Sequence, residues 1–124
     1  MPKTILVIDD ESVLQKALGE FLSTQGYSAL PALDGETGLA LAKEKKPNLI
    51  LLDLVMPKKN GFEVLQLLKR DPTTKDIPII VLTNLAEMAD IDKAIELGAT
   101  TYLVKSDYAM SDILEKIKST LGEN

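Results

Sequence analysis

The stretch LILLDLVMPKKNGFEVL, residues 49–65, decides the fold class. It opens with an unbroken apolar run from Leu49 to Leu52, which is typical of a strand buried on both faces. Asp53 follows this run directly, and after a loop the apolar residues return at helical spacing from Phe62 to Leu68. The stretch therefore predicts a buried strand, an acid at its carboxyl end, and an amphipathic helix that Asp71-Pro72 closes.

The same alternation extends outward in both directions through the 124 residues. The other apolar runs that predict strands are Ile5 to Ile8, Tyr27 to Leu30, Ile79 to Leu82 and Tyr102 to Val104. Helical patterns occupy Val13 to Leu22 before a left-handed cap at Gly26, then Gly38 to Lys45, Met88 to Leu97, and Ile113 to Leu121 with Ser111-Asp112 as its N-cap. Strict alternation predicts one α/β domain over residues 1–124, with a five-stranded parallel sheet and helices on both faces.

The composition excludes several kinds of chemistry. The chain has no Cys and no His, so thiolate nucleophiles, zinc-thiolate sites and Ser-His-Asp triads are excluded, and a reducing, cytoplasmic compartment is expected. A formal net charge of -5 argues against direct nucleic-acid binding, which needs a basic surface. The apolar run near the amino end stops at acids and is far too short to span a membrane.

Charged and hydroxyl side chains follow the predicted strands. Asp9-Asp10 comes after the first strand, Asp53 after the third, Thr83 after the fourth and Lys105 after the fifth. Each has an ordinary explanation when taken alone: Asp10 could cap a helix, Asp53 could open a turn and Lys105 could be a solvated charge. Together they should meet, because the carboxyl ends of parallel strands share one edge of the sheet and ligands bind there.

Three carboxylates at one edge repel each other unless a cation neutralises them. With no His or Cys ligand in the chain, an oxygen-preferring ion such as Mg²⁺ fits best. Such an ion also binds phosphoryl oxygens, so one acid can serve as a phosphate-accepting nucleophile. Asp53 is the best candidate because it ends the central strand, while Lys105 and Thr83 would contact the phosphoryl oxygens.

At these residues the sequence resembles the receiver domain of two-component response regulators. The motifs are ILVIDDE at 5–11, the stretch quoted at 49–65, IPIIVLTN at 77–84 and GATTYLVK at 98–105. The resemblance implies a flavodoxin-like, doubly wound (βα)5 fold with strand order 2-1-3-4-5. It also implies Asp53 as phosphoacceptor, Asp9, Asp10 and the Val55 carbonyl as Mg²⁺ ligands with Mn²⁺ as a possible substitute, Lys105 and Thr83 at the phosphoryl group, and Thr83 and Tyr102 as switch residues.

The same resemblance implies a signalling switch and not an enzyme beyond its own phosphorylation and dephosphorylation. The phosphoryl donor would be a sensor histidine kinase or a phosphotransfer protein. A downstream protein would bind the face formed by the fourth helix, fifth strand and fifth helix of a monomer or weak dimer. We expect a stand-alone switch; a receiver excised from a longer transcription factor is the other possibility.

Three positions depart from the family pattern. Ser106 follows Lys105 where the family usually has a cis proline, and we expect a trans bond because a cis bond without proline costs about 2.5–4 kcal/mol. Asn84 stands where a small residue is usual. Val55 and Leu85 flank the site with apolar side chains that cannot orient an attacking water, which predicts slow self-dephosphorylation.

Two other functions remain open from the sequence. One is a Mg²⁺-dependent phosphohydrolase with an aspartyl nucleophile, although the first strand ends in Asp9-Asp10-Glu11 and lacks the D-x-D pattern of haloacid-dehalogenase-like enzymes. The other is an interaction module that works without phosphorylation, as the unusual residues Asn84 and Ser106 would allow.

Overall fold

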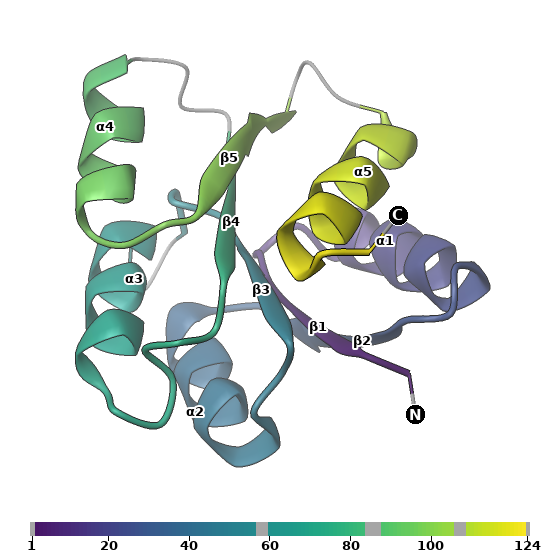
Figure 1. Ribbon diagram of the computed structural model, residues 1–124, viewed down its shortest axis with the longest axis horizontal. Coiled ribbons are helices and arrows are strands. Elements are labelled where there is room, and N and C mark those ends of the chain that lie inside the picture. The colour runs from purple at the N-terminus through teal and green to yellow at the C-terminus, as the bar shows by residue number, and fades with distance from the viewer. Residues whose placement is uncertain (1, 57–59, 84–87, 106–108, 124) are drawn as a thin grey trace.

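The computed structural model describes residues 2–56, 60–83, 88–105 and 109–123, with the backbone alone at residues 83, 88 and 89. Strands and helices alternate along these residues (Figure 1). The strands are β1 (Thr4–Ile8), β2 (Ser28–Ala32), β3 (Leu49–Leu52), β4 (Ile79–Thr83) and β5 (Thr101–Val104). The helices are α1 (Ser12–Thr24), α2 (Gly35–Lys45), α3 (Gly61–Arg70), α4 (Met88–Glu96) and α5 (Met110–Leu121).

The strands form one sheet in the order β2-β1-β3-β4-β5, which confirms the predicted order. Every neighbouring pair is parallel. At the carboxyl end of β1, Ile8 lies beside Ala32 of β2 on one side and beside Leu52 of β3 on the other. The chain reverses its direction of winding between β1 and β3, which is where open α/β sheets form their binding sites.

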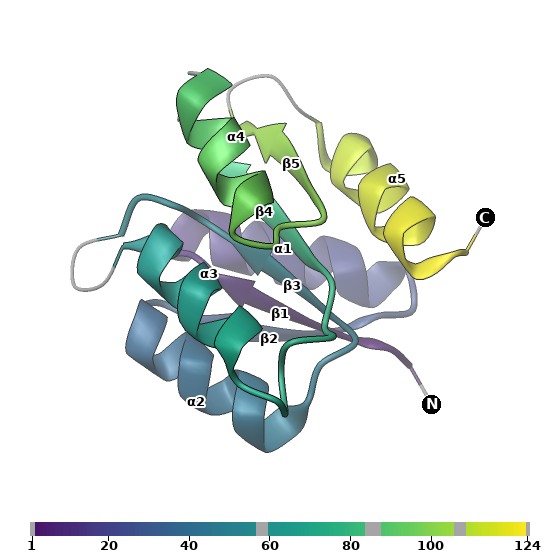
Figure 2. The ribbon, with the colours of Figure 1, turned by 60° about the vertical axis from the view of Figure 1, so that its left-hand side comes forward.

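Helices cover both faces of the sheet (Figure 2), and each face has its own apolar core. Helices α2, α3 and α4 cover one face, where Leu6 and Ile8 of β1 join the core of the same layer. Helices α1 and α5 cover the other face, where Ile5 and Val7 of the same strand point. Because successive residues of a strand face opposite sides, an unbroken apolar run is what a strand covered on both faces requires.

The ends of several elements differ from the prediction. Tyr27 lies outside β2, because its N–H donates to the Leu22 carbonyl at 3.0 Å as part of the turn that ends α1. Gly26 in that turn has a φ of +89°, as its predicted left-handed cap requires. Helix α2 begins three residues earlier than the predicted Gly38, since Asp34 accepts a hydrogen bond from the Thr37 N–H and caps it.

The predicted N-cap of the last helix is wrong. Helix α5 begins at Met110 with Ala109 as N-cap, and Ser111 and Asp112 lie inside its first turn. The Asp112 carboxylate accepts a hydrogen bond from the Ala109 N–H at 2.8 Å, so the acid caps the helix from its third position. The Met110 side chain packs against the core layer beneath α1 and α5. Among the described residues, no helix is long and apolar enough to cross a membrane.

Candidate functional site

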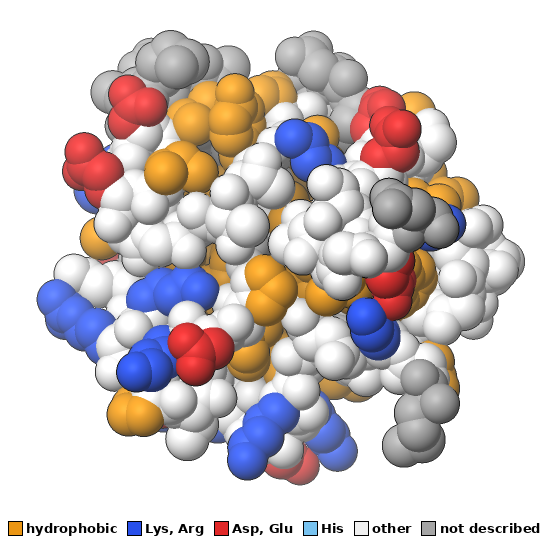
Figure 3. Space-filling view, in the orientation of Figure 1, with side chains coloured by type: hydrophobic (Ala, Val, Ile, Leu, Met, Phe, Trp, Pro, Cys, Tyr) orange, Lys and Arg blue, Asp and Glu red, His pale blue; other side chains and the backbone are white. Residues whose placement is uncertain are grey.

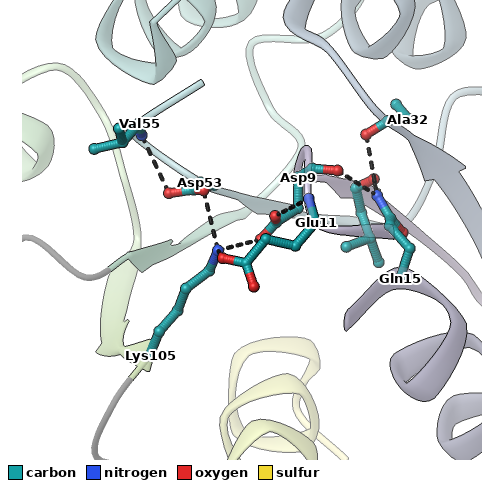
Figure 4. Close-up of polar contacts among 8 residues, drawn as sticks. Asp9, Glu11, Gln15, Ala32, Asp53, Val55 and Lys105 are labelled. Carbon is teal, nitrogen blue, oxygen red and sulfur yellow. Dashed lines mark hydrogen bonds and ion pairs between the residues drawn. The ribbon is translucent and has the colours of Figure 1, made fainter. Parts of the chain in front are cut away.

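Three charged residues meet at the carboxyl edge of the sheet (Figure 4). Asp9 follows β1, Asp53 follows β3 and Lys105 follows β5. The hydrogen-bond ladder continues one residue beyond the strands: the Asp9 N–H donates to the Ala32 carbonyl at 3.0 Å, and the Asp53 N–H donates to the Ile8 carbonyl at 2.9 Å. The backbones of both acids are therefore fixed by the sheet itself.

The two buried carboxylates are held in the same way. Asp9 Oδ1 accepts a hydrogen bond from the N–H of Glu11 at 2.9 Å, and Asp53 Oδ1 accepts one from the N–H of Val55 at 3.1 Å. Each acid thus forms a tight turn with the residue two places later. The ordinary explanation that Asp10 caps the following helix does not hold, since the N-cap of α1 is Glu11 and no side chain bonds there. With one oxygen fixed, each carboxylate presents its other oxygen to the centre of the site.

Lys105 occupies that centre. Its Nζ lies 2.7 Å from Asp9 Oδ2 and 3.0 Å from Asp53 Oδ2, and its side chain is only 6% exposed. A third acid, Glu11, also contacts the ammonium at 2.7 Å, although its side chain is half exposed. The sequence prediction missed Glu11, because its contact depends on how the loop after β1 folds back over Lys105. The hydrogen bond from the Glu11 N–H to the Asp9 carboxylate closes the turn that brings Glu11 to Lys105.

The protonation of these groups follows from burial and from their neighbours. Burial raises the pKa of Asp9 and of Asp53 above the ordinary 3.8, and it outweighs the lowering by Lys105 and by the backbone N–H donors. Burial alone would lower the pKa of Lys105, but contacts with Asp9, Glu11 and Asp53 outweigh it and raise that pKa. The lysine therefore stays charged, while the ionised forms of the two acids are disfavoured.

Asp9, Asp10 and Asp53 fit a divalent cation. Each offers a carboxylate oxygen, and these oxygens lie within 4.8 Å of one another. Asp9 Oδ2 is buried and, among the described residues, forms no well-aligned hydrogen bond and contacts Lys105 only as an ion pair. With Glu11 the site holds four carboxylates, three of which contact the Lys105 ammonium. An all-oxygen set with surplus negative charge suits Mg²⁺ or Mn²⁺.

The other predicted residues lie along the same edge or leading to it. Thr83 ends β4 beside Val104 of β5; its side chain is outside the described part of the structure. Tyr102 lies three residues before Lys105, half-buried and packed against the core beneath α2, α3 and α4. It also lines a groove between β5 and α5. The departures at Asn84, Leu85 and Ser106, including the Lys105–Ser106 bond, are outside the described residues.

The sequence analysis missed two residues that lie next to the site. Gly61 begins α3 against the end of β3, where its N–H donates to the Leu54 carbonyl at 2.9 Å. A Cβ at residue 61 would collide with the Asp53 carbonyl oxygen, so only glycine lets the helix start this close to the phosphoacceptor candidate. The other is Gln15, a polar residue on the buried face of α1 that repeats with Leu18 and Leu22. This helical spacing with Leu18 and Leu22 indicates from the sequence that Gln15 is buried.

This fold and this site define the class of protein. Residues 5–118 match the family described as the response regulator receiver domain, and the chain belongs to that family. The probable transcriptional regulator ycf27 of Porphyridium aerugineum is 42% identical over 117 residues, which are 94% of this chain and 47% of that protein. The chain spans about half the length of the curated relatives it matches.

Solved structures are similar over nearly the whole chain. A CheY-like receiver domain protein from Methanospirillum hungatei JF-1 superposes with a TM-score of 0.92 at 28% identity, covering 98% of this chain and 95% of that one. The manganese-bound form of response regulator Rcp1 gives a TM-score of 0.80 at 34% identity, with 95% and 93% covered. The chain is therefore a phosphorylation-driven response-regulator switch with an acidic pocket at Asp9, Asp10 and Asp53. Over residues 5–118 the chain is a receiver domain, whose chemistry is its own phosphorylation and dephosphorylation, and this decides against the phosphohydrolase.

Proposed function

We propose that Asp53 is the phosphoacceptor of this receiver and that Asp9, Asp10 and the Val55 backbone carbonyl hold Mg²⁺, which Mn²⁺ can replace. One observation carries this proposal: Lys105 Nζ bridges Asp9 Oδ2 and Asp53 Oδ2 in a buried pocket with a surplus of carboxylates. The manganese-bound relative Rcp1 supports the choice of ion. A bound divalent cation neutralises charge on the phosphoryl oxygens during transfer.

The chain's own residues supply the rest of the reaction. A carboxylate oxygen of Asp53 attacks the phosphorus of a phosphohistidine on the donor, and a P–O bond forms as the P–N bond breaks. The bonding electron pair stays on the imidazole nitrogen, which takes up a proton from solvent. Lys105 already contacts Asp53 Oδ2 and would turn its ammonium toward the new phosphoryl oxygens as a charge-assisted donor. The Thr83 hydroxyl is the proposed second donor.

Phosphorylation would then change the surface beyond the pocket. The phosphoryl group adds about −1.5 to −2 charge next to Lys105. If Thr83 moves toward it, space opens for Tyr102, which lies opposite Val81 and lines the groove between β5 and α5. Figure 3 shows hydrophobic side chains reaching the surface between α4 and β5. This α4-β5-α5 face is the proposed binding surface for a downstream protein.

The partners follow from membership of the family. The donor would be a sensor histidine kinase or a phosphotransfer protein, which agrees with the absence of His from the chain. We propose that residues 1–124 act as one cytoplasmic receiver domain, as a monomer or weak dimer without direct nucleic-acid contact. The face drawn in Figure 3 supports the last point, since Lys and Arg side chains are interspersed with Asp and Glu.

Incubation with phosphoramidate and Mg²⁺ tests this assignment without a kinase. We expect wild type and Glu123→Ala to incorporate phosphate, and Asp53→Ala to incorporate none, because it lacks the accepting oxygen. Glu123 is a suitable control because it lies at the opposite end of the sheet, where it pairs with Lys3. Phosphorylation of Asp53→Ala at the wild-type level would contradict the proposal. If the wild type incorporates none, the phosphorylation-independent interaction module is favoured.

The phosphorylated state should decay slowly. Val55 lies two residues from Asp53 and is 55% exposed, so an apolar surface flanks the pocket where a water would attack. We expect Val55→Asn to lose phosphate several times faster, because an amide can orient that water. The decay of phosphoprotein after removal of the donor measures both rates, and identical fast decay in both proteins would contradict this explanation.

A further inference from the structure

Gln15 of α1 is a buried polar residue for which the phosphorylation chemistry gives no role. It is 8% exposed and lies on the face of the helix that Leu18 and Leu22 bury against the sheet. Its Nε2 donates to the carbonyls of Val7 at 2.8 Å, Ala32 at 3.0 Å and Asp9 at 3.1 Å (Figure 4). One amide group with two N–H bonds thus serves three carbonyl oxygens.

These three carbonyls converge where β1 and β2 end. Each carbonyl oxygen is partly negative, and buried carbonyls that lack a donor are strongly disfavoured. The Gln15 amide therefore holds the carboxyl ends of two strands to the first turns of α1. The backbone N–H of Gln15 also donates to the carbonyl of Glu11 at 3.0 Å, which joins α1 to the loop that follows β1.

The hydrogen bonds of Gln15 help to fix the backbone of Asp9. Its N–H is bound to the Ala32 carbonyl, its own carbonyl to Gln15 Nε2, and its carboxylate to the Glu11 N–H. Both backbone polar groups of Asp9 are thus paired, and among the described residues Gln15 is the only side chain that bonds to its backbone. Without that amide, the carbonyl of Asp9 loses its partner, and the peptide that joins Asp9 to Asp10 is free to rotate.

We propose that Gln15 is a positioning residue for the divalent-cation site and fixes the peptide that carries the Asp9-Asp10 pair. This inference rests on the proposed role of Asp9, Asp10 and Asp53 in holding the cation. The neutral amide suits the task. A glutamate there would add a fifth carboxylate near the four already present and would direct its oxygens at three carbonyls. Groups that orient metal ligands commonly change metal affinity by about 10–100-fold when they are removed.

Cation titration of three proteins by isothermal calorimetry tests the proposal. Gln15→Met keeps the length of the side chain and removes its donors, while Gln66→Met makes the same change on α3, on the other face of the sheet. We expect Gln15→Met to bind Mg²⁺ about tenfold more weakly than wild type, and Gln66→Met to match wild type. The loss of Ca²⁺ affinity should be smaller, because Mg²⁺ demands near-ideal octahedral geometry and Ca²⁺ tolerates irregular sites. A residue that only stabilises the fold would not change the ratio of the two affinities.

The possible results separate the two proposals. If wild type binds neither cation, the proposed cation site is wrong and this inference falls with it. If wild type binds Mg²⁺ and folded Gln15→Met binds it equally well, or loses both cations equally, the site stands and the role of Gln15 is refuted. A second measurement needs no variant: Mg²⁺ should shift the side-chain amide NMR signals of Gln15 in wild type and leave those of Gln66 unchanged. Unshifted Gln15 signals at saturating Mg²⁺ would also overturn the inference.

Discussion

A lysine meets acids at each end of the sheet, and the two clusters differ in burial and in charge balance. At the amino end, Lys3 is 40% exposed and, of the acids in the described ranges, pairs only with Glu123, at 2.7 Å. At the carboxyl end, Lys105 is 6% exposed and contacts Asp9, Glu11 and Asp53. The first is a surface ion pair that joins the two ends of the chain. The second places one ammonium among more carboxylates than it can neutralise.

The pKa values of the acids shift in opposite directions at the two ends of the sheet. Hydrogen bonds from Lys3 and then Tyr27 lower the pKa of Glu123, so its ionised form is favoured in the folded protein. Burial raises the pKa of Asp9 and Asp53, so their ionised forms are disfavoured despite Lys105. The same residue types therefore stabilise one end and leave unsatisfied negative charge at the other. Such a surplus is what a site for a cation and a phosphoryl group requires, and functional sites often reduce stability in this way.

Of the substitutions that test this comparison, the removal of Lys105 should cause the largest loss of stability. Lys105→Met leaves Asp9 and Asp53 buried without a counter-ion, and we expect the free energy of unfolding to fall by about 3 kcal/mol near neutral pH. Lys3→Met should change it little, because exposed ion pairs contribute little. Urea unfolding without metal measures both. Added Mg²⁺ should recover part of the Lys105→Met loss, and equal losses in the two variants would contradict the distinction.

Neutralising one acid at the carboxyl end should raise the free energy of unfolding, whereas the removal of Lys105 lowers it. With a pKa above 3.8 in the folded state, Asp53 binds its proton more tightly there than in the unfolded chain. Its stabilising contribution is complete below the unfolded pKa and is lost as the pH rises through the raised folded pKa. We expect Asp53→Asn to be more stable than metal-free wild type near neutral pH by about 0.5–2 kcal/mol.

The pH dependence checks the cause of that difference. The free energy of unfolding of Asp53→Asn should exceed that of wild type by a growing amount as the pH rises from about 4. Below that pH the difference between the two proteins should disappear. Unfolding curves in metal-free buffers over this range give the comparison. A constant difference at every pH would show that the stabilisation does not come from the Asp53 charge.

The smallest effect is expected at the exposed edge of the carboxyl-end cluster. Glu11→Gln removes an acid whose side chain is 52% exposed and which contacts Lys105 at 2.7 Å. Solvent screens this pair, so the free energy of unfolding should change by no more than about 0.5 kcal/mol. A loss as large as that of Lys105→Met would mean that Glu11 belongs to the buried part of the site.

The strands and the buried charges were predictable because two simple rules govern them. Unbroken apolar runs predicted β1, β3 and β4, and the carboxyl-end rule brought Asp9, Asp53 and Lys105 together. What the sequence did not reveal depends on side chains that reach backbone groups or loops. Asp112 caps α5 from inside the helix, and Glu11 reaches Lys105 only because a turn carries it there.

Gln15 shows the same limit in the interior. Its position on the buried face of α1 is readable from its spacing with Leu18 and Leu22, but its partners are carbonyls of two strands. The residue types at those positions do not show which carbonyls will accept a side-chain donor, because that donor is brought there by the tertiary structure. Helix boundaries and polar partners of this kind follow from the assembled sheet.

Chemical mapping of the phosphoryl group tests the central claim most directly. Borohydride reduces an aspartyl phosphate to homoserine, so protein treated with phosphoramidate, then with borohydride, records the acceptor in its peptide masses. The account predicts homoserine at position 53 when Mg²⁺ is present and unmodified Asp53 when the metal is chelated. Homoserine at another acid, or modification of Asp53 that is independent of the metal, would contradict it.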